Sequence, residues 1–235
     1  MQHEIRTSNA PNERIMQKYW ALNPSKQLRE RGIRLYFKSL SNEFIGEILR
    51  TGDLKMRQAV VQSTTRIPAE LQHDYERLLE DPSYLTVEQA LYLLWVQIPG
   101  KRDEYLRMTE GIVGMPDRNV QLMWLLLASL TRDYTKKALR QAYRNELASY
   151  TSPEHSFEVR QRAFILLAEI QGMNDQNFKD LINATVHPQY AFRSFARELL
   201  DTYLNIPDEK ERLRKLADGL KPSELRYITK KLSIE

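Results

Sequence analysis

The feature that most constrains this chain is a phrase that occurs twice. Residues 157–170 read FEVRQRAFILLAEI, and residues 190–203 read YAFRSFARELLDTY. Both stretches place an arginine directly after an apolar residue, then an alanine three residues later and a leucine four residues after that. Because residues three and four apart lie on one face of an α-helix, both stretches are predicted to be amphipathic helices.

The rest of the chain shows the same helical spacing, and no strand-like alternation of apolar and polar residues persists. Glycine and proline stand between the periodic segments. At Thr51-Gly52-Asp53, for example, a glycine that can end one helix precedes an aspartate that can cap the next. The chain is therefore predicted to be all-α. Such breaks predict helices at residues 12–22, 25–40, 42–51, 53–66, 69–80, 86–97, 101–112, 117–131, 134–150, 155–171, 175–186, 188–204, 208–218 and 222–232.

A looser form of the phrase recurs in every second predicted helix. With the arginine position relaxed, the matching polar residues are Arg57, Glu88, Gln121, Arg160 and Arg193, at steps of 31, 33, 39 and 33 residues. A repeat of that length made of two helices is typical of an α-solenoid. We therefore predict a single domain, an α-α superhelix (HEAT-like solenoid) of about five helix pairs. Its repeats span residues 42–204, with N-terminal helices in 1–41 and a C-terminal cap in 205–235.

The repeated residue types have a physical reason in such a fold. One helical hairpin cannot bury its apolar face alone, so successive hairpins must stack. A small residue such as Ala163 or Ala196 allows neighbouring helices to approach, and the leucine one turn later fills the space between them. The arginine lies at the edge of the apolar stripe, where its guanidinium can reach an acid or a carbonyl of the adjacent pair.

Charge and composition narrow the possible partners. The chain has 35 lysines and arginines against 31 acidic residues, and the two signs are interspersed. This pattern favours a solvated surface over a nucleic-acid-binding patch. The longest apolar runs, at residues 90–96 and 123–128, are much shorter than a membrane-spanning helix requires. We therefore predict neither a nucleic-acid partner nor a membrane span.

The sequence shows no catalytic constellation and no metal site. There is no cysteine, which excludes disulfides, thiolate zinc sites and thiol nucleophiles. His3-Glu4 begins like the zinc-protease motif H-E-x-x-H, but Thr7 occupies the position of the second histidine. Neither a glycine-rich phosphate loop nor a G-x-S-x-G elbow occurs. The prominent aromatic residues have core spacing and are expected to pack rather than to bind a ligand: Tyr19, Trp20, Tyr36, Phe37, Trp95 and Trp124.

The recurring polar positions allow two interpretations. Arg57, Arg160 and Arg193 are expected to make hydrogen bonds between repeats, which is the favoured interpretation. Alternatively, they form a row of cations on one surface that holds a peptide carboxylate or a phosphate, with Glu88 and Gln121 between them. These five residues are the candidate peptide-facing site.

Three segments, NERIMQKYWALNPSKQLRERGIRLYFKSL (12–40), VRQRAFILLAEI (159–170) and FKDLINATVHPQYAFRSFARELLDTYL (178–204), resemble the C-terminal helical region of zinc aminopeptidases of the aminopeptidase N type, in particular those of Bacteroides-like bacteria. The family's zinc-binding and substrate motifs belong to its catalytic domain and do not occur here. The resemblance therefore implies a fragment of a peptide hydrolase, with zinc in a catalytic domain outside this chain. It implies that the chain closes over that domain's cleft and restricts or positions the peptide substrate.

The alternative is a free-standing HEAT-like scaffold that binds a protein or a nucleic acid. The weak net charge of +4 argues against the nucleic-acid form.

Overall fold

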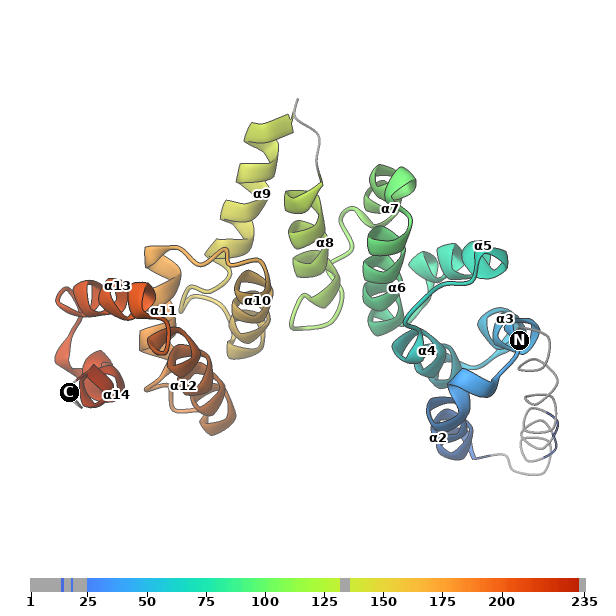
Figure 1. Ribbon diagram of the computed structural model, residues 1–235, viewed down its shortest axis with the longest axis horizontal. Helices are drawn as coiled ribbons and strands as arrows, with labels where there is room; N and C mark the ends of the chain where they lie inside the picture. The colour runs from blue at the N-terminus through green and yellow to red at the C-terminus, as the bar shows by residue number, and fades with distance from the viewer. Residues whose placement is uncertain (1–13, 15–17, 19–24, 132–135, 233–235) are drawn as a thin grey trace. The chain divides into compact units, whose positions relative to one another are not determined.

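The computed structural model describes residues 14, 18, 25–131 and 136–232, and their regular structure is helical throughout (Figure 1). This confirms the all-α prediction. The helix predicted at residues 12–22, and Tyr19 and Trp20 within it, lie almost wholly outside the described residues. The chain forms two compact units, Met1–Ile112 and Val113–Glu235, here called unit 1 and unit 2. The single-domain organisation stays a prediction.

Unit 1 contains the described helices between Lys26 and Thr109. They are α2 (Lys26–Tyr36) with a 3₁₀ turn at Phe37–Ser39, α3 (Asn42–Thr51), α4 (Leu54–Ser63), α5 (Gln72–Glu76) between 3₁₀ turns at Ala69–Leu71 and Arg77–Glu80, α6 (Tyr84–Gln97), and α7 (Arg102–Thr109) after a 3₁₀ turn at Pro99–Lys101.

Unit 2 contains the remaining described helices. They are α8 (Asn119–Leu130), α9 (Lys137–Ser149), α10 (Phe157–Glu169), α11 (Asp175–Ala184), α12 (Tyr190–Leu204), α13 (Pro207–Ala217) and α14 (Pro222–Leu232). Both units contain a run of three even-numbered helices in which each packs against the next even-numbered helix. In unit 1, α4 packs against α2 and α6, and in unit 2, α10 packs against α8 and α12.

The local signals explain most helix boundaries. The Asp53 carboxylate accepts hydrogen bonds from the backbone amides of Lys55 and Met56, so it caps α4 as predicted. The helix predicted at residues 86–97 begins two residues earlier, at Tyr84, and the side chain of Ser83 caps it by accepting a hydrogen bond from the Thr86 amide. Ser83 follows Pro82, and this serine hydroxyl is an N-cap as good as that of a threonine.

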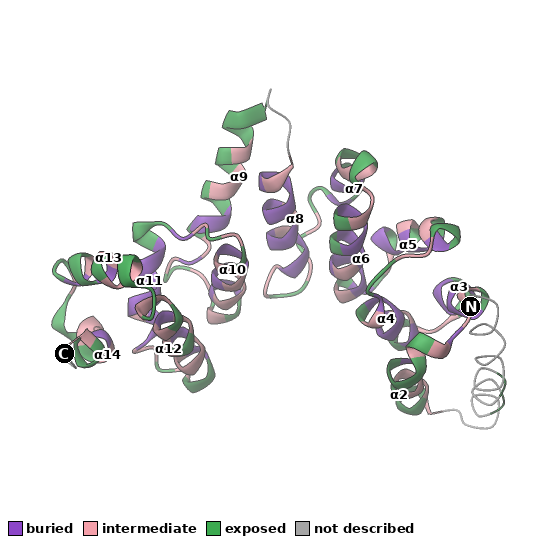
Figure 2. Ribbon diagram, viewed as in Figure 1, coloured by how far each residue is buried: buried purple, intermediate pink, exposed green. Residues whose placement is uncertain are grey.

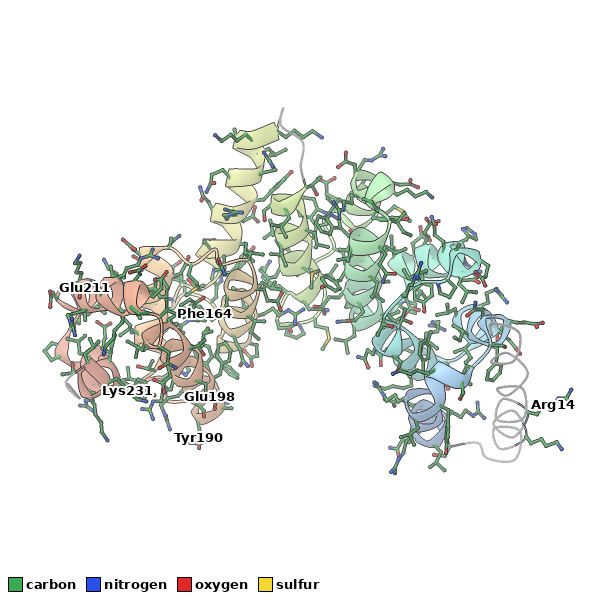
Figure 3. The ribbon with its side chains drawn as sticks, in the orientation of Figure 1. Arg14, Phe164, Tyr190, Glu198, Glu211 and Lys231 are labelled. Atoms are coloured by element: carbon green, nitrogen blue, oxygen red, sulfur yellow. The ribbon has the colours of Figure 1, made fainter. Side chains whose placement is uncertain are left out.

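The matched positions of the repeated phrase form the core of unit 2. Ala163 and Leu167 of α10 are fully buried, and so are Ala196 and Leu200 of α12. Figure 2 shows buried residues along α8 and α10, whereas the first turns of α9 are mostly exposed. Phe164, also fully buried, is labelled on α10 in Figure 3. The small-then-large pattern therefore serves helix packing, as predicted.

The predicted packing of the aromatic residues is confirmed for two of them and wrong for one. Trp95 is buried in α6, and Trp124 of α8 meets the Tyr143 ring edge-on at 5.1 Å between centroids. Tyr36, by contrast, is 51% exposed. It is the last residue of α2, where the backbone tightens into a 3₁₀ turn and the α-helical register of the buried stripe is lost.

Among the described residues, none of the helices combines the length and the apolar character needed to cross a bilayer.

Candidate functional site

Arg57 connects two successive helix pairs. It lies near the start of α4, and its Nε donates to Asp81 Oδ2 at 2.5 Å, across to the segment that leads into α6. Its Nη1 donates to the Gly52 carbonyl just before its own helix. The side chain of Arg57 is 17% exposed and that of Asp81 3%. This ion pair is largely shielded from water and joins the start of α4 to the segment before α6. That these helices are repeats of one another stays a prediction.

Arg160 makes the corresponding connection in unit 2, but it is buried. Its Nε donates to the Thr151 carbonyl at 2.9 Å and its Nη2 to the Asp180 carbonyl of α11 at 3.3 Å. Its guanidinium also lies 5.1 Å from the centroid of the Phe192 ring in α12. Burial lowers the pKa of Arg160, and the nearby Asp180 charge opposes that shift. Arg160 therefore holds α10, α11 and α12 together.

A buried polar network surrounds these bonds. Thr151 Oγ1 donates to Asp180 Oδ2 at 2.7 Å, and Asn177 Nδ2 donates to the Ala148 carbonyl at 2.8 Å and to Thr151 Oγ1 at 2.9 Å. Thr151 is fully buried and Asn177 nearly so. Since buried polar groups require partners, this network fixes the turn between α9 and α10 against α11.

Arg193 departs from the predicted contact between repeats. Its Nη1 donates to the carbonyls of His187 at 2.7 Å and Pro188 at 3.1 Å, both in the loop before its own helix α12. Its guanidinium also lies 5.4 Å from the ring centroid of Tyr190. Tyr190 is 75% exposed and points away from the other helices at the start of α12 (Figure 3). Arg193 therefore lies at an accessible end of unit 2.

Glu88 and Gln121 differ in accessibility. Glu88 is 2% exposed within α6. Gln121 of α8 is half-buried, accepts a hydrogen bond from Arg118 Nη1 at 2.5 Å and donates to the Tyr150 hydroxyl at 3.2 Å. Arg57 in unit 1 and Gln121 and Arg193 in unit 2 are partly exposed, whereas Arg160 and Glu88 are buried inside their own units. The peptide-facing row as a whole stays a prediction.

His187 lies beside two of the predicted arginines. Its ring meets the Phe192 ring at 5.1 Å between centroids and the Phe157 ring at 6.3 Å. Burial and the charges of Arg160 and Arg193 lower the pKa of His187, which favours the neutral imidazole. His187 Nδ1 accepts a hydrogen bond from the Gln189 amide. These contacts place His187 in the packing of the loop before α12.

The described residues contain no group of three or more histidine or acidic side chains arranged to hold a metal ion. His3, the residue that begins the partial zinc-protease motif, lies outside them.

A charged cluster in unit 1 escaped the sequence reasoning. Glu76 Oε1 accepts hydrogen bonds from Gln72, Lys101 and the hydroxyl of Tyr105, each at 2.8–2.9 Å. Burial alone would raise the pKa of Glu76, but these hydrogen bonds and the Lys101 charge outweigh burial and lower the pKa to about 2. The partners come from α5, the turn before α7, and α7, so no local pattern could reveal the cluster.

This cluster predicts a pH dependence. Because the pKa of Glu76 is lowered on folding, its stabilising effect is fully present above its unfolded value of 4.5 and is lost as the pH falls toward 2. We expect wild type to be more stable than Glu76→Gln at pH 7, and the difference to shrink at pH 3. Urea unfolding at both pH values measures it. A difference independent of pH would contradict the assignment.

Unit 2 also has a cavity of about 540 Å³ that was not predicted from the sequence. The loop that lines it was predicted only as a break between two helices. The loop before α8 and one side of α10 both line this cavity. The lining residues are Met115, Pro116, Asp117, Glu158, Gln161, Arg162 and Ile165. The sequence Gly114-Met115-Pro116-Asp117, which is typical of a tight turn and lies just before α8, was the one local sign that this loop has a fixed shape.

Comparisons with protein families, with curated proteins and with solved structures find no match to this chain.

Proposed function

We propose that this chain is a non-catalytic helical-repeat module of the HEAT-like α-α superhelix type. The observation that carries the proposal is the serial packing of α8, α10 and α12, with the matched alanines and leucines of the last two buried at their contacts. The ties made by Arg57 and Arg160 to the following helix pair support it. In a repeat fold each pair contacts its neighbours, and the exposed edges of the helices remain available for binding.

We further propose that the module is the C-terminal helical domain of a zinc aminopeptidase of the aminopeptidase N type. The resemblance of residues 12–40, 159–170 and 178–204 supports this assignment. In that role the chain closes over the cleft of its own catalytic domain and limits which peptides enter. Zinc and water activation belong to that catalytic domain, and specificity comes from exclusion and positioning.

Within that proposal the accessible members of the predicted row contact the peptide. Arg57, Gln121 and Arg193 are partly exposed, and the two arginines offer planar donor groups that suit a carboxylate or a peptide carbonyl. Arg160 and Glu88 support the helices from inside.

The test begins with the coding sequence upstream of Met1, which is expected to encode an H-E-x-x-H helix. The longer polypeptide should then hydrolyse leucine 4-nitroanilide, whereas the present chain alone should not. A coding sequence that begins at Met1, or hydrolysis by the present chain alone, would rule the proposal out.

The second candidate is a free-standing scaffold for a protein partner. The observation that favours it is exposed apolar surface on α6, where Tyr92 and Val96 are 42% and 44% exposed and lie one turn apart. Such surface suits a protein partner better than a nucleic acid. Binding of duplex DNA that weakens steeply with salt would instead indicate the nucleic-acid form.

A further inference from the structure

The loop that precedes α8 has a fixed, unusual backbone. Gly114 has a φ of 96°, and a side chain there would meet Asn119 Oδ1 and the Val120 amide. Arg118 also lies in the left-handed region, with a φ of 55°. The Arg118 amide donates to the Met115 carbonyl at 2.8 Å, which closes a tight turn around Pro116 and Asp117. Asn119 Oδ1 accepts from the Met115 amide at 2.9 Å. The turn therefore holds Asp117 in one place beside α10.

Asp117 has a carboxylate oxygen without a donor. Its Oδ1 atom is buried, and the described residues give it no hydrogen-bond partner. A buried acceptor that is left unpaired costs free energy, and for a carboxylate the cost is larger than for a neutral group. Asp117 as a residue is only partly buried and lines the cavity, so a cation placed against its carboxylate would offset that cost through charge attraction.

The charges around the cavity are unbalanced. Glu158 lies on its rim, is exposed, and makes no side-chain ion pair with the described residues. Arg162 is the cavity's cation, but Glu169, which does not line the cavity, interacts with its charge. Two carboxylates thus line the cavity against one arginine, so the lining carries a net negative charge and attracts a cation.

The remaining lining is apolar. Met115, Pro116 and Ile165 can pack against an aliphatic chain, and exposed Val113 extends this surface beyond the cavity. A small amine or a metal ion would make no contact with these apolar side chains. A lysine or arginine side chain flanked by apolar residues could place its charge beside the carboxylates and its aliphatic stem against the apolar lining.

We propose that this cavity, the 115–165 pocket (Met115, Pro116, Asp117, Glu158, Gln161, Arg162 and Ile165), binds a lysine or arginine side chain of a partner polypeptide. The cation pairs with Asp117 and Glu158, and its stem packs on Met115, Pro116 and Ile165. This assignment concerns the chain alone and does not require the aminopeptidase proposal, which is tested by hydrolysis.

The test is a titration of the ¹⁵N-labelled full chain with acetyl-Val-Lys-Val-amide, followed by amide chemical shifts. The expected result is saturable shifts confined to residues 113–118 and 158–165. The matched peptide with norleucine in place of lysine should bind about tenfold more weakly, because it lacks the charged hydrogen bond. Shifts elsewhere, or equal binding of the norleucine peptide, would overturn the proposal.

Variants of the chain separate the effect of the pocket's charges on peptide binding from effects on folding. Asp117→Asn should weaken binding of the lysine peptide about tenfold, and Glu158→Gln about threefold, since Glu158 is exposed. Glu154→Gln, an exposed acid outside the pocket, should leave it unchanged. Ile165→Lys retains both acids and should abolish binding by placing an ammonium group in the pocket. If Asp117→Asn and Ile165→Lys both bind the lysine peptide like wild type, the pocket is not the site.

Discussion

Replacement of Arg160 by alanine is expected to lower the free energy of unfolding of unit 2 by about 3 kcal/mol. The side chain is 2% exposed, so its removal leaves a space that water cannot fill readily. The Thr151 and Asp180 carbonyls each lose a charged donor, and the Asp180 side chain loses a nearby positive charge. Three helices lose their common contact, because Arg160 touches α11 and α12 from α10.

Urea unfolding measures the loss, and hydrogen–deuterium exchange of residues 157–169 and 190–204 localises it to unit 2. The matched control is Arg226→Ala on α14, an exposed arginine whose removal should change stability by less than about 0.5 kcal/mol. Equal effects of the two substitutions would mean that the Arg160 hydrogen bonds contribute little, and the repeated arginine would lose its structural explanation.

Replacement of Phe192 by alanine is expected to cost about 4 kcal/mol. Phe192 is fully buried in α12, and its ring meets those of Phe157 and His187 as well as the Arg160 guanidinium. The substitution therefore creates a cavity and also removes the face on which the arginine rests.

Phe195 on the same helix is the matched control for this second prediction. It is only half-buried, so Phe195→Ala should cost clearly less than Phe192→Ala in thermal or urea unfolding. If both variants lost the same stability, the interface between α10 and α12 would not be the centre of the core of unit 2.

The helices could be predicted from sequence because their ends have local causes. Asp53 caps the helix that follows it, and Pro207 and Pro222 begin the last two helices, where a missing amide costs nothing. The buried stripe of α10 and α12 was equally legible, since Ala163 and Ala196 repeat at the same place in the same phrase.

The polar site was harder to predict because one residue type serves different environments. Arg57, Arg160 and Arg193 occupy the same position in the phrase, yet their contacts differ. Arg57 forms an ion pair with Asp81, the buried Arg160 donates to backbone carbonyls, and Arg193 donates only to carbonyls of the loop before its own helix. What decides between these outcomes is the residue opposite, some 20 to 30 positions away. Asp81 is available to Arg57, and the described residues provide no such acid for Arg193.

The Glu76 cluster and the 115–165 pocket likewise depend on residues that are distant in the sequence. Lys101 and Tyr105 meet Glu76 only because α7 folds back on α5, and Asp117 meets α10 only because a left-handed turn aims it there. Sequence spacing reports neighbours within a helix, whereas these sites are built between helices.

The central claim is that Arg57 and Arg160, at matched positions of the phrase, tie one helix pair to the next. A double-mutant cycle on Arg57 and Asp81 tests it most directly, with Arg57→Ala, Asp81→Ala and the double variant compared by urea unfolding. The cycle cancels the separate bonds to the Gly52 carbonyl and the Ser83 amide. We predict a coupling energy of about 2 kcal/mol, since the pair is shielded from water. Additive effects of the two substitutions, within about 0.5 kcal/mol, would contradict the claim.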